Sequence, residues 1–184
     1  MDHLVLVSPR QRHLKWTGFD KLEAAVMILC GVAIAGFTLT VFFDVTSRTI
    51  GRPWLWLQEV TTHFFVYGIF LGTAAATRRN DHLYLSAVVE SFSGGMRVFF
   101  EVFTRIAVLA VAVCLVVFGH ENFLHGFGSV RMPSLTPEAS LTFAIPLCGL
   151  LVGLFTIEQL VNGLRNGFPA PVPEEEDPAA GRVP

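Results

Sequence analysis

With 184 residues, of which 52% are hydrophobic and 15% charged, the chain lacks the composition of a water-soluble domain, since such domains are about 45–50% apolar and about 25% charged. Its net charge of −2 argues against a nucleic-acid partner. The apolar residues, including 17 phenylalanines, gather in long runs, which predicts an all-α integral membrane protein.

The first apolar run predicts a membrane span at about residues 22–45, after a polar, basic, cytoplasmic N-terminal segment at residues 1–18. About 20 apolar residues in a helix cross a bilayer. A cleavable signal peptide is the competing interpretation, with Ala33 to Ala35 as its cleavage site. A signal's apolar core has about 7–15 residues, and this run continues past the alanines. Asp44 and Arg48 end the span on one helix face.

The second run has the features of a span at about residues 55–77. Trp54 and Trp56 precede it, and tryptophan rings favour the headgroup zone. Arg78 and Arg79 end it, and we expect them in the opposite headgroup zone, on the cytoplasmic side.

Three small residues, Gly68, Gly72 and Ala76, recur every four positions in this span and therefore share one helix face. Small residues let two helix backbones approach closely in a membrane. We expect this face to contact another helix, either in this chain or in a partner. A Gly72→Leu substitution should then weaken assembly without blocking membrane insertion.

The remaining elements complete a four-span membrane domain at residues 19–168. An amphipathic stripe predicts a surface helix lying on the membrane between the second and third spans. The predicted ranges are about 84–95 for the surface helix, 97–119 for the third span, 120–137 for a loop, 137–162 for the fourth span and 169–184 for a disordered acidic tail. Thr136, Pro137 and Glu138 resemble a helix N-terminus, and Pro146 should bend the helix that follows.

The basic residues predict the orientation. Most of them fall on one side of the predicted spans, and cytoplasmic loops carry the excess of lysine and arginine. That side contains Arg10, Arg12, Lys15, Lys21, Arg78, Arg79, Arg97 and Arg165, and the other side contains Arg48, Arg52 and Arg131. Both termini are therefore expected in the cytoplasm.

Glu59 is the first candidate for chemistry, since a carboxylate entering an apolar layer is costly unless it is paired or hydrated. His63 lies one turn deeper on the same face. The two residues could form a proton or ion relay. Alternatively, Glu59 could anchor an outer loop by pairing with Arg48 or Arg52.

Two further function classes stay open. His63, His120 and His125 are expected near one membrane face, where a helical bundle could hold a haem for electron transfer. A small membrane enzyme is the other alternative, although no hydrolase, zinc-protease or nucleotide-binding motif occurs in the sequence. The three cysteines lie within apolar runs and form no CxxC pair, so we interpret them as core residues.

A family resemblance rests on the stretch from Arg48 to His82. An arginine closes the first span, a tryptophan stands three residues before a glutamate, and Leu-Gly, small residues, an arginine and a histidine follow. The residues that carry it are Arg48, Trp56, Glu59, Leu71, Gly72, Ala74 to Ala76, Arg78 and His82. This pattern resembles the small membrane subunit (DctQ-like) of tripartite ATP-independent periplasmic (TRAP) transporters.

The resemblance implies a non-catalytic subunit without a cofactor in the bacterial inner membrane. It implies that a large multi-span subunit carries the solute with sodium, and that a periplasmic binding protein delivers that solute, typically an organic acid. The small subunit would support the large one within the lipid. On this interpretation the structural or subunit-interface residues are Arg48, Trp56, Glu59, Gly68, Gly72, Ala76, Arg78 and His82.

Overall fold

A computed structural model of the chain describes residues 15–79, 95–132 and 134–167. The first 14 residues, His82, the acidic tail and all but the last residue of the surface helix predicted at about 84–95 lie outside the described residues. The elements are η2 (Thr17–Phe19), α1 (Asp20–Thr49), α2 (Trp56–Arg79), α4 (Gly95–His125), η3 (Gly126–Gly128), β1 (Val130–Arg131), β2 (Thr136–Pro137), α5 (Ala139–Thr142) and α6 (Ala144–Asn166).

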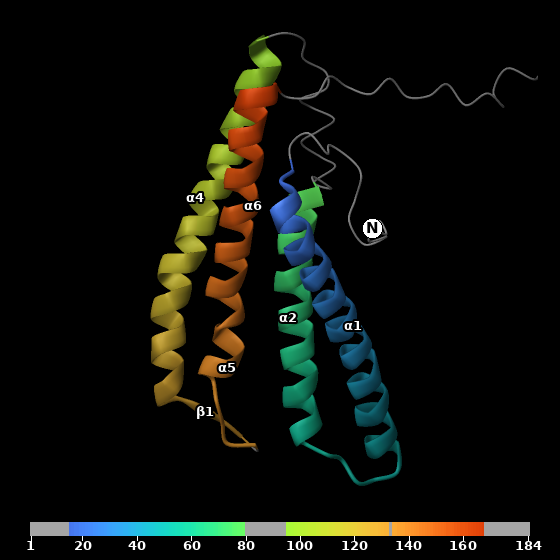
Figure 1. The fold of residues 1–184 in the computed structure, drawn as a ribbon. Coiled ribbons are helices and arrows are strands. Elements are labelled where there is room, and N and C mark those ends of the chain that lie inside the picture. Colours follow the sequence, from blue (N-terminus) through green and yellow to red (C-terminus); the bar gives the residue numbers. More distant parts are fainter. Residues whose placement is uncertain (1–14, 80–94, 133, 168–184) are drawn as a thin grey trace, which may run out of the picture.

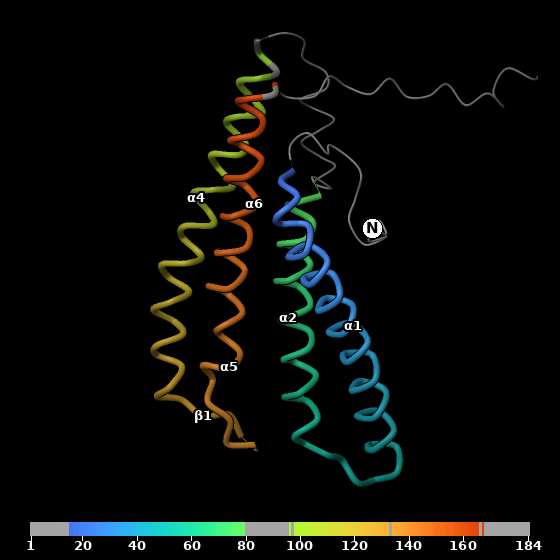
Figure 2. Tube along the Cα trace, in the orientation of Figure 1, coloured from blue at the N-terminus to red at the C-terminus, as the bar shows by residue number. Residues whose placement is uncertain are grey.

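The helices form two antiparallel pairs. Helix α1 packs along α2, α4 packs along α6, and α2 contacts α6 to join the pairs. Figure 1 shows the start of α1 and the end of α6 at the same end of the bundle. The connection between α1 and α2, and the short β1–β2 hairpin, lie at the opposite end. In Figure 2 the traces of α1 and α2 move apart toward that connection.

Four helices of the described structure are long and apolar enough to cross a membrane: Thr17–Thr49, Trp56–Arg79, Val98–Gly128 and Ala139–Arg165. Large apolar side chains cover their outer faces; Phe42 is 64% exposed and Phe118 is 66% exposed. A water-soluble protein rarely exposes apolar patches of such extent. These exposed faces therefore suit lipid, as the composition predicted.

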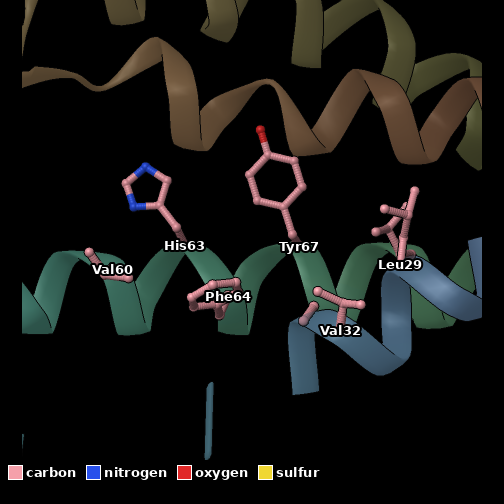
Figure 3. A pocket seen from close by; sticks show the side chains of 8 residues that line it. Leu29, Val32, Val60, His63, Phe64 and Tyr67 are labelled. Carbon is pink, nitrogen blue, oxygen red and sulfur yellow. The ribbon is translucent and has the colours of Figure 1, made fainter. Parts of the chain in front are cut away.

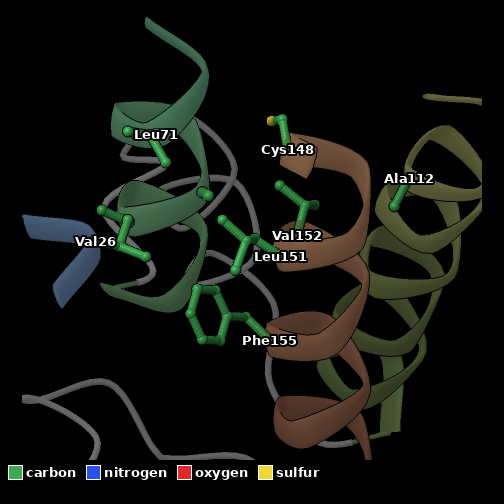
Figure 4. Packing of buried hydrophobic residues seen from close by; sticks show 9 residues of the cluster. Val26, Leu71, Ala112, Cys148, Leu151, Val152 and Phe155 are labelled. Atoms are coloured by element: carbon green, nitrogen blue, oxygen red, sulfur yellow. The ribbon is translucent and has the colours of Figure 1, made fainter. Parts of the chain in front are cut away.

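The buried apolar core lies between the two helix pairs. Figure 4 shows Leu71 of α2 and Val26 of α1 facing Leu151 and Phe155 of α6. Phe155 is fully buried, and Ala112 of α4 closes the far side of α6. One cluster thus includes residues of α1, α2, α4 and α6, so the four helices share a single core.

Several glycines lie at the contacts between helices. An ideal Cβ on Gly68 would lie 3.6 Å from Ala33 Cβ, and one on Gly72 would lie 3.5 Å from Cys30 Sγ. The predicted small-residue face of α2 therefore contacts α1 within this chain. A Cβ on Gly149 of α6 would lie only 2.9 Å from the Ala112 carbonyl oxygen, so α4 and α6 are in contact at backbone level.

The third predicted span is longer than expected. Helix α4 continues to His125, so the prediction of a loop beginning at His120 is wrong. His120, Glu121 and Asn122 look like loop residues because they are polar. They instead continue the helix beyond its apolar part, where polar side chains are readily hydrated.

The predicted start of the fourth helix is also wrong. Thr136 and Pro137 form strand β2, which pairs with β1, and the first helical residue is Ala139. The helix is interrupted just before Pro146: α5 ends at Thr142 and α6 begins at Ala144. Pro146 has no N–H for the Thr142 carbonyl, and this missing bond accounts for the interruption at Phe143.

Candidate functional site

The most unusual residue of the bundle is Arg78, at the end of α2. Its side chain is fully buried, although arginine is almost never fully buried unless it is paired. Two alanines, Ala74 and Ala75, precede it on α2 and are also buried. Their small side chains let α6 approach this turn of α2, so the guanidinium meets α6 rather than solvent.

Arg78 binds acidic groups from two other helices. Its Nε and Nη2 donate to the two carboxylate oxygens of Glu158 on α6, each at 3.1 Å. Its Nη1 donates to Glu23 of α1 at 2.9 Å, and Nη2 lies 3.2 Å from Asp20 Oδ1. Bidentate arginine–carboxylate pairs are among the stronger protein hydrogen bonds and fix geometry as well as charge. We call these four residues the Arg78 centre.

Backbone groups complete the coordination of the guanidinium. Nη1 also donates to the Phe19 carbonyl, and Nη2 donates to the Trp16 carbonyl at 3.1 Å. The Phe155 ring lies 5.4 Å from the guanidinium carbon, within cation–π range. Every nitrogen of the guanidinium therefore has an acceptor, and the burial of its charge is compensated.

Two further basic groups balance the charge of the Arg78 centre. Lys15 Nζ lies 3.9 Å and Arg79 Nε 3.5 Å from the Glu23 carboxylate. With Arg78, they offset the three carboxylates. Burial lowers the pKa of Lys15, and the neighbouring carboxylate of Glu23 opposes that shift.

Helix α6 also binds the end of α2 and the segment before α1. Gln159 Nε2 donates to the Thr77 and Arg78 carbonyls, which lie in the last turn of α2. Trp16 donates its backbone N–H to Glu158 and its indole N–H to Asn162. Helix α6, the last turn of α2 and the segment before α1 are far apart in sequence and are held together here. Hydrogen bonds are strong in such a site with little water.

The structure corrects the predicted role of Arg78. It does not extend outward as an exposed cation that ends the span, but is the most buried cation of the described bundle. Sequence reasoning did not identify Asp20, Glu23 or Glu158 as its partners. The available signal was Glu158, a carboxylate within the last apolar run, because an acid inside a span requires a partner.

Glu59 forms a second polar cluster at the other end of α2. It is largely buried and accepts hydrogen bonds from the Ser134 hydroxyl and, at 3.5 Å, from the Thr136 hydroxyl. Arg131 lies close enough to interact electrostatically. Glu59 thus anchors a loop, as one of the two alternatives proposed, but it anchors the β1–β2 hairpin. The predicted partnership with Arg48 is wrong, because Arg48 Nε pairs with Asp44 at 3.0 Å.

These contacts predict the outcome of a double-mutant cycle. Glu59→Gln removes the charge of the acceptor and Ser134→Ala removes the donor of the same hydrogen bond, so their effects on thermal stability should be non-additive by about 0.5–3 kcal/mol. Glu59→Gln and Arg48→Ala should instead add within about 0.5 kcal/mol. Coupling between Glu59 and Arg48, measured by thermal unfolding in detergent, would contradict the geometry.

His63 and Tyr67 connect α2 to α5. Figure 3 shows both side chains pointing from α2 toward the segment that contains α5 and α6. His63 Nε2 lies 2.9 Å from the Ser140 hydroxyl, and the Tyr67 hydroxyl donates to the Ser140 carbonyl at 2.7 Å. His63 Nδ1 lies 2.7 Å from the Glu59 carbonyl. Both ring nitrogens thus have protein neighbours, so this arrangement does not present His63 to a haem iron.

The groove beside these residues is apolar. It has a volume of about 310 Å³ and is lined by Leu29, Val32, Ala33, Val60, His63, Phe64, Tyr67 and Leu71. Within the described ranges, no group of three or more His, Cys, Asp or Glu side chains is arranged to hold a metal ion. Because most of the side chains that line it are apolar, this groove suits hydrocarbon.

The other predicted site residues fall at separate places. Trp56 is half exposed and stacks on Trp54 with ring centroids 6.5 Å apart, as suits an interfacial pair. Ala76 is partly buried on α2, near the Arg78 centre. His82 lies outside the described residues. The motif-bearing stretch thus contributes to two structural clusters rather than to one site.

A comparison with protein families gives one result that bears on function. The family described as "Tripartite ATP-independent periplasmic transporters, DctQ component" matches residues 37–166. A comparison with curated proteins returned no match. The matched range includes α2, α4 and α6, whereas the residues of α1 that contact Arg78 precede it.

Proposed function

Because this chain belongs to the DctQ family of TRAP transporter components, we propose that it is the static support of the large transport subunit. On this proposal the large subunit moves an organic acid inward with sodium, after a periplasmic binding protein has delivered it. The chain itself carries no solute. A DctQ component is part of a transporter and not an enzyme, so the interpretations as a membrane enzyme and as a haem-bearing electron carrier are both replaced.

The observation that carries the proposal is the Arg78 centre. A support for a moving partner has to resist separation of its own helices. The centre joins α1, α2 and α6 through a guanidinium whose nitrogens all have acceptors. The Glu59 cluster and the Ser140 contacts hold α2 to the β1–β2 hairpin and α5 at the opposite end. These contacts connect the two helix pairs at both ends of the bundle.

The proposed location is the bacterial inner membrane, with both termini in the cytoplasm. The start of α1 and the end of α6 lie at one end of the bundle (Figure 1), as an even number of spans requires. The excess of basic residues at that end supports the cytoplasmic assignment. The Arg78 centre would then lie near the cytoplasmic face and Glu59 near the periplasmic face.

Reconstitution tests the proposal. Proteoliposomes should take up the solute only when they contain this chain, the large subunit, the binding protein and an inward sodium gradient. The chain alone should give no uptake, and a tagged chain should co-purify with the large subunit. Uptake by the chain alone, or full uptake by the large subunit without it, would refute the supporting role.

A further inference from the structure

A small pocket occupies the end of the bundle that contains the α1–α2 connection. It has a volume of about 210 Å³. One wall is a single face of the last two turns of α1, and the other is the connection itself. Its lining residues are Phe43, Thr46, Ser47, Ile50, Arg52 and Trp54.

The hydroxyl groups of this pocket already donate their protons within the chain. Thr46 donates to the Phe42 carbonyl at 2.7 Å, and Ser47 donates to the Asp44 carbonyl at 2.9 Å. The Trp54 backbone N–H lies 3.4 Å from the Ser47 hydroxyl oxygen. In the part of the chain that the structure describes, the Arg52 guanidinium and the Trp54 indole N–H meet no acceptor. The Arg52 guanidinium and the Trp54 indole N–H therefore remain available as donors, and they favour an anionic ligand whose oxygen atoms can accept hydrogen bonds.

The charges at this end of the bundle support the same conclusion. Among the described residues, three arginines occur here. Arg48 pairs with Asp44, and Arg131 lies near Glu59. Arg52 has no carboxylate companion in the described structure, so a positive charge remains at the pocket mouth.

We infer that this pocket binds the phosphate of a membrane phospholipid, with Arg52 and Trp54 as its donors and an acyl chain along the exposed face of α1. Arginine binds phosphate oxygens through its planar set of N–H groups. The pocket lies where a span leaves the hydrocarbon, beside the stacked pair of Trp54 and Trp56. Ile50 is 71% exposed and Phe42 is 64% exposed, which provides the apolar surface that an acyl chain needs. The inference requires neither the orientation nor the partner proposed above, because phosphates line both membrane faces.

Native mass spectrometry of the chain purified with its large subunit tests this site. The probes are phosphatidylglycerol, diacylglycerol with the same acyl chains, and inorganic phosphate. Arg52→Gln should weaken binding of one phosphatidylglycerol about tenfold or more, because it removes a charge-assisted contact. Trp54→Phe, which keeps a ring but removes the N–H, should weaken binding less. Arg165→Gln removes an exposed positive charge at the other end of the bundle and should leave this binding unchanged.

The probes separate the competing outcomes. Preferential binding of phosphatidylglycerol, lost in Arg52→Gln and kept in Arg165→Gln, supports the site. Equal binding of diacylglycerol would show that the phosphate is not recognised and would overturn the inference. Displacement of the lipid by millimolar inorganic phosphate would assign the pocket to a free anion and overturn it as well. So would unchanged lipid binding by Arg52→Gln.

Discussion

Replacing Arg78 by glutamine should destabilise the bundle by about 3–5 kcal/mol, the usual cost of removing one partner from a buried ion pair. The substitution leaves Glu23 and Glu158 buried without the cation that now bridges them. Their carboxylates would have to take up protons or draw water into the bundle, and both cost free energy. Thermal unfolding followed by size-exclusion chromatography in detergent measures the effect.

Two matched variants make the Arg78 test specific. Arg78→Lys keeps the charge, but a single ammonium cannot bond both Glu158 oxygens and the Phe19 and Trp16 carbonyls at once. We expect it to lose most of the stability. Arg79→Gln should cost about 1 kcal/mol or less, because the side chain of Arg79 is partly exposed. An Arg78→Lys variant as stable as the native chain would show that charge alone suffices.

The second large effect is expected at Gly149, where α4 and α6 are in contact at backbone level. The added Cβ of a Gly149→Ala variant would lie 2.9 Å from the Ala112 carbonyl oxygen and 2.9 Å from Leu115 Cβ. Since neither group can move without shifting helix α4, we expect a loss of about 1–3 kcal/mol from overpacking. The melting temperature of the purified chain should fall accordingly.

Gly153, one turn further along α6, is the matched control. A Cβ there would lie 3.8 Å from Ala112 Cβ, an ordinary contact distance. Alanine favours a helix over glycine by about 0.8–1 kcal/mol, so Gly153→Ala should be neutral or stabilising. Opposite signs at the two glycines would confirm that backbone approach, rather than helix propensity, controls this interface. Equal losses would contradict it.

The four membrane helices were predictable because nearly all membrane-spanning helices share one sequence pattern. About 20 apolar residues bounded by tryptophan or arginine indicate a membrane helix in almost any context. The small-residue face of α2 was likewise predictable from its four-residue spacing. Whether α1 or another subunit covers that face was not predictable, because the spacing of small residues does not identify the helix that packs against them.

The ion pairs were not predictable for a specific reason. An arginine at the end of a span has the same sequence appearance whether it meets headgroups or a buried carboxylate. Arg78 was therefore assigned to the interface, and its bond to Glu158, 80 residues away, depends on how α2 and α6 align. Thr136 shows the same limit on a smaller scale. The sequence Thr136, Pro137, Glu138 is typical of a helix N-terminus. In the structure the Thr136 hydroxyl instead lies 2.9 Å from the Ser134 hydroxyl and 3.5 Å from the Glu59 carboxylate.

Whether α2 and α6 stay fixed during transport is the most direct test of the supporting role. Nitroxide labels at Ile69 on α2 and Leu154 on α6, both half exposed, would report their separation by pulsed electron resonance. Cys30, Cys114 and Cys148 would first be replaced by alanine, and the labelled chain would be studied in the assembled transporter. The account predicts one narrow distance distribution that is unchanged by sodium, solute and binding protein. A second distance that appears with these ligands would show that the helix pairs move and would contradict a static support.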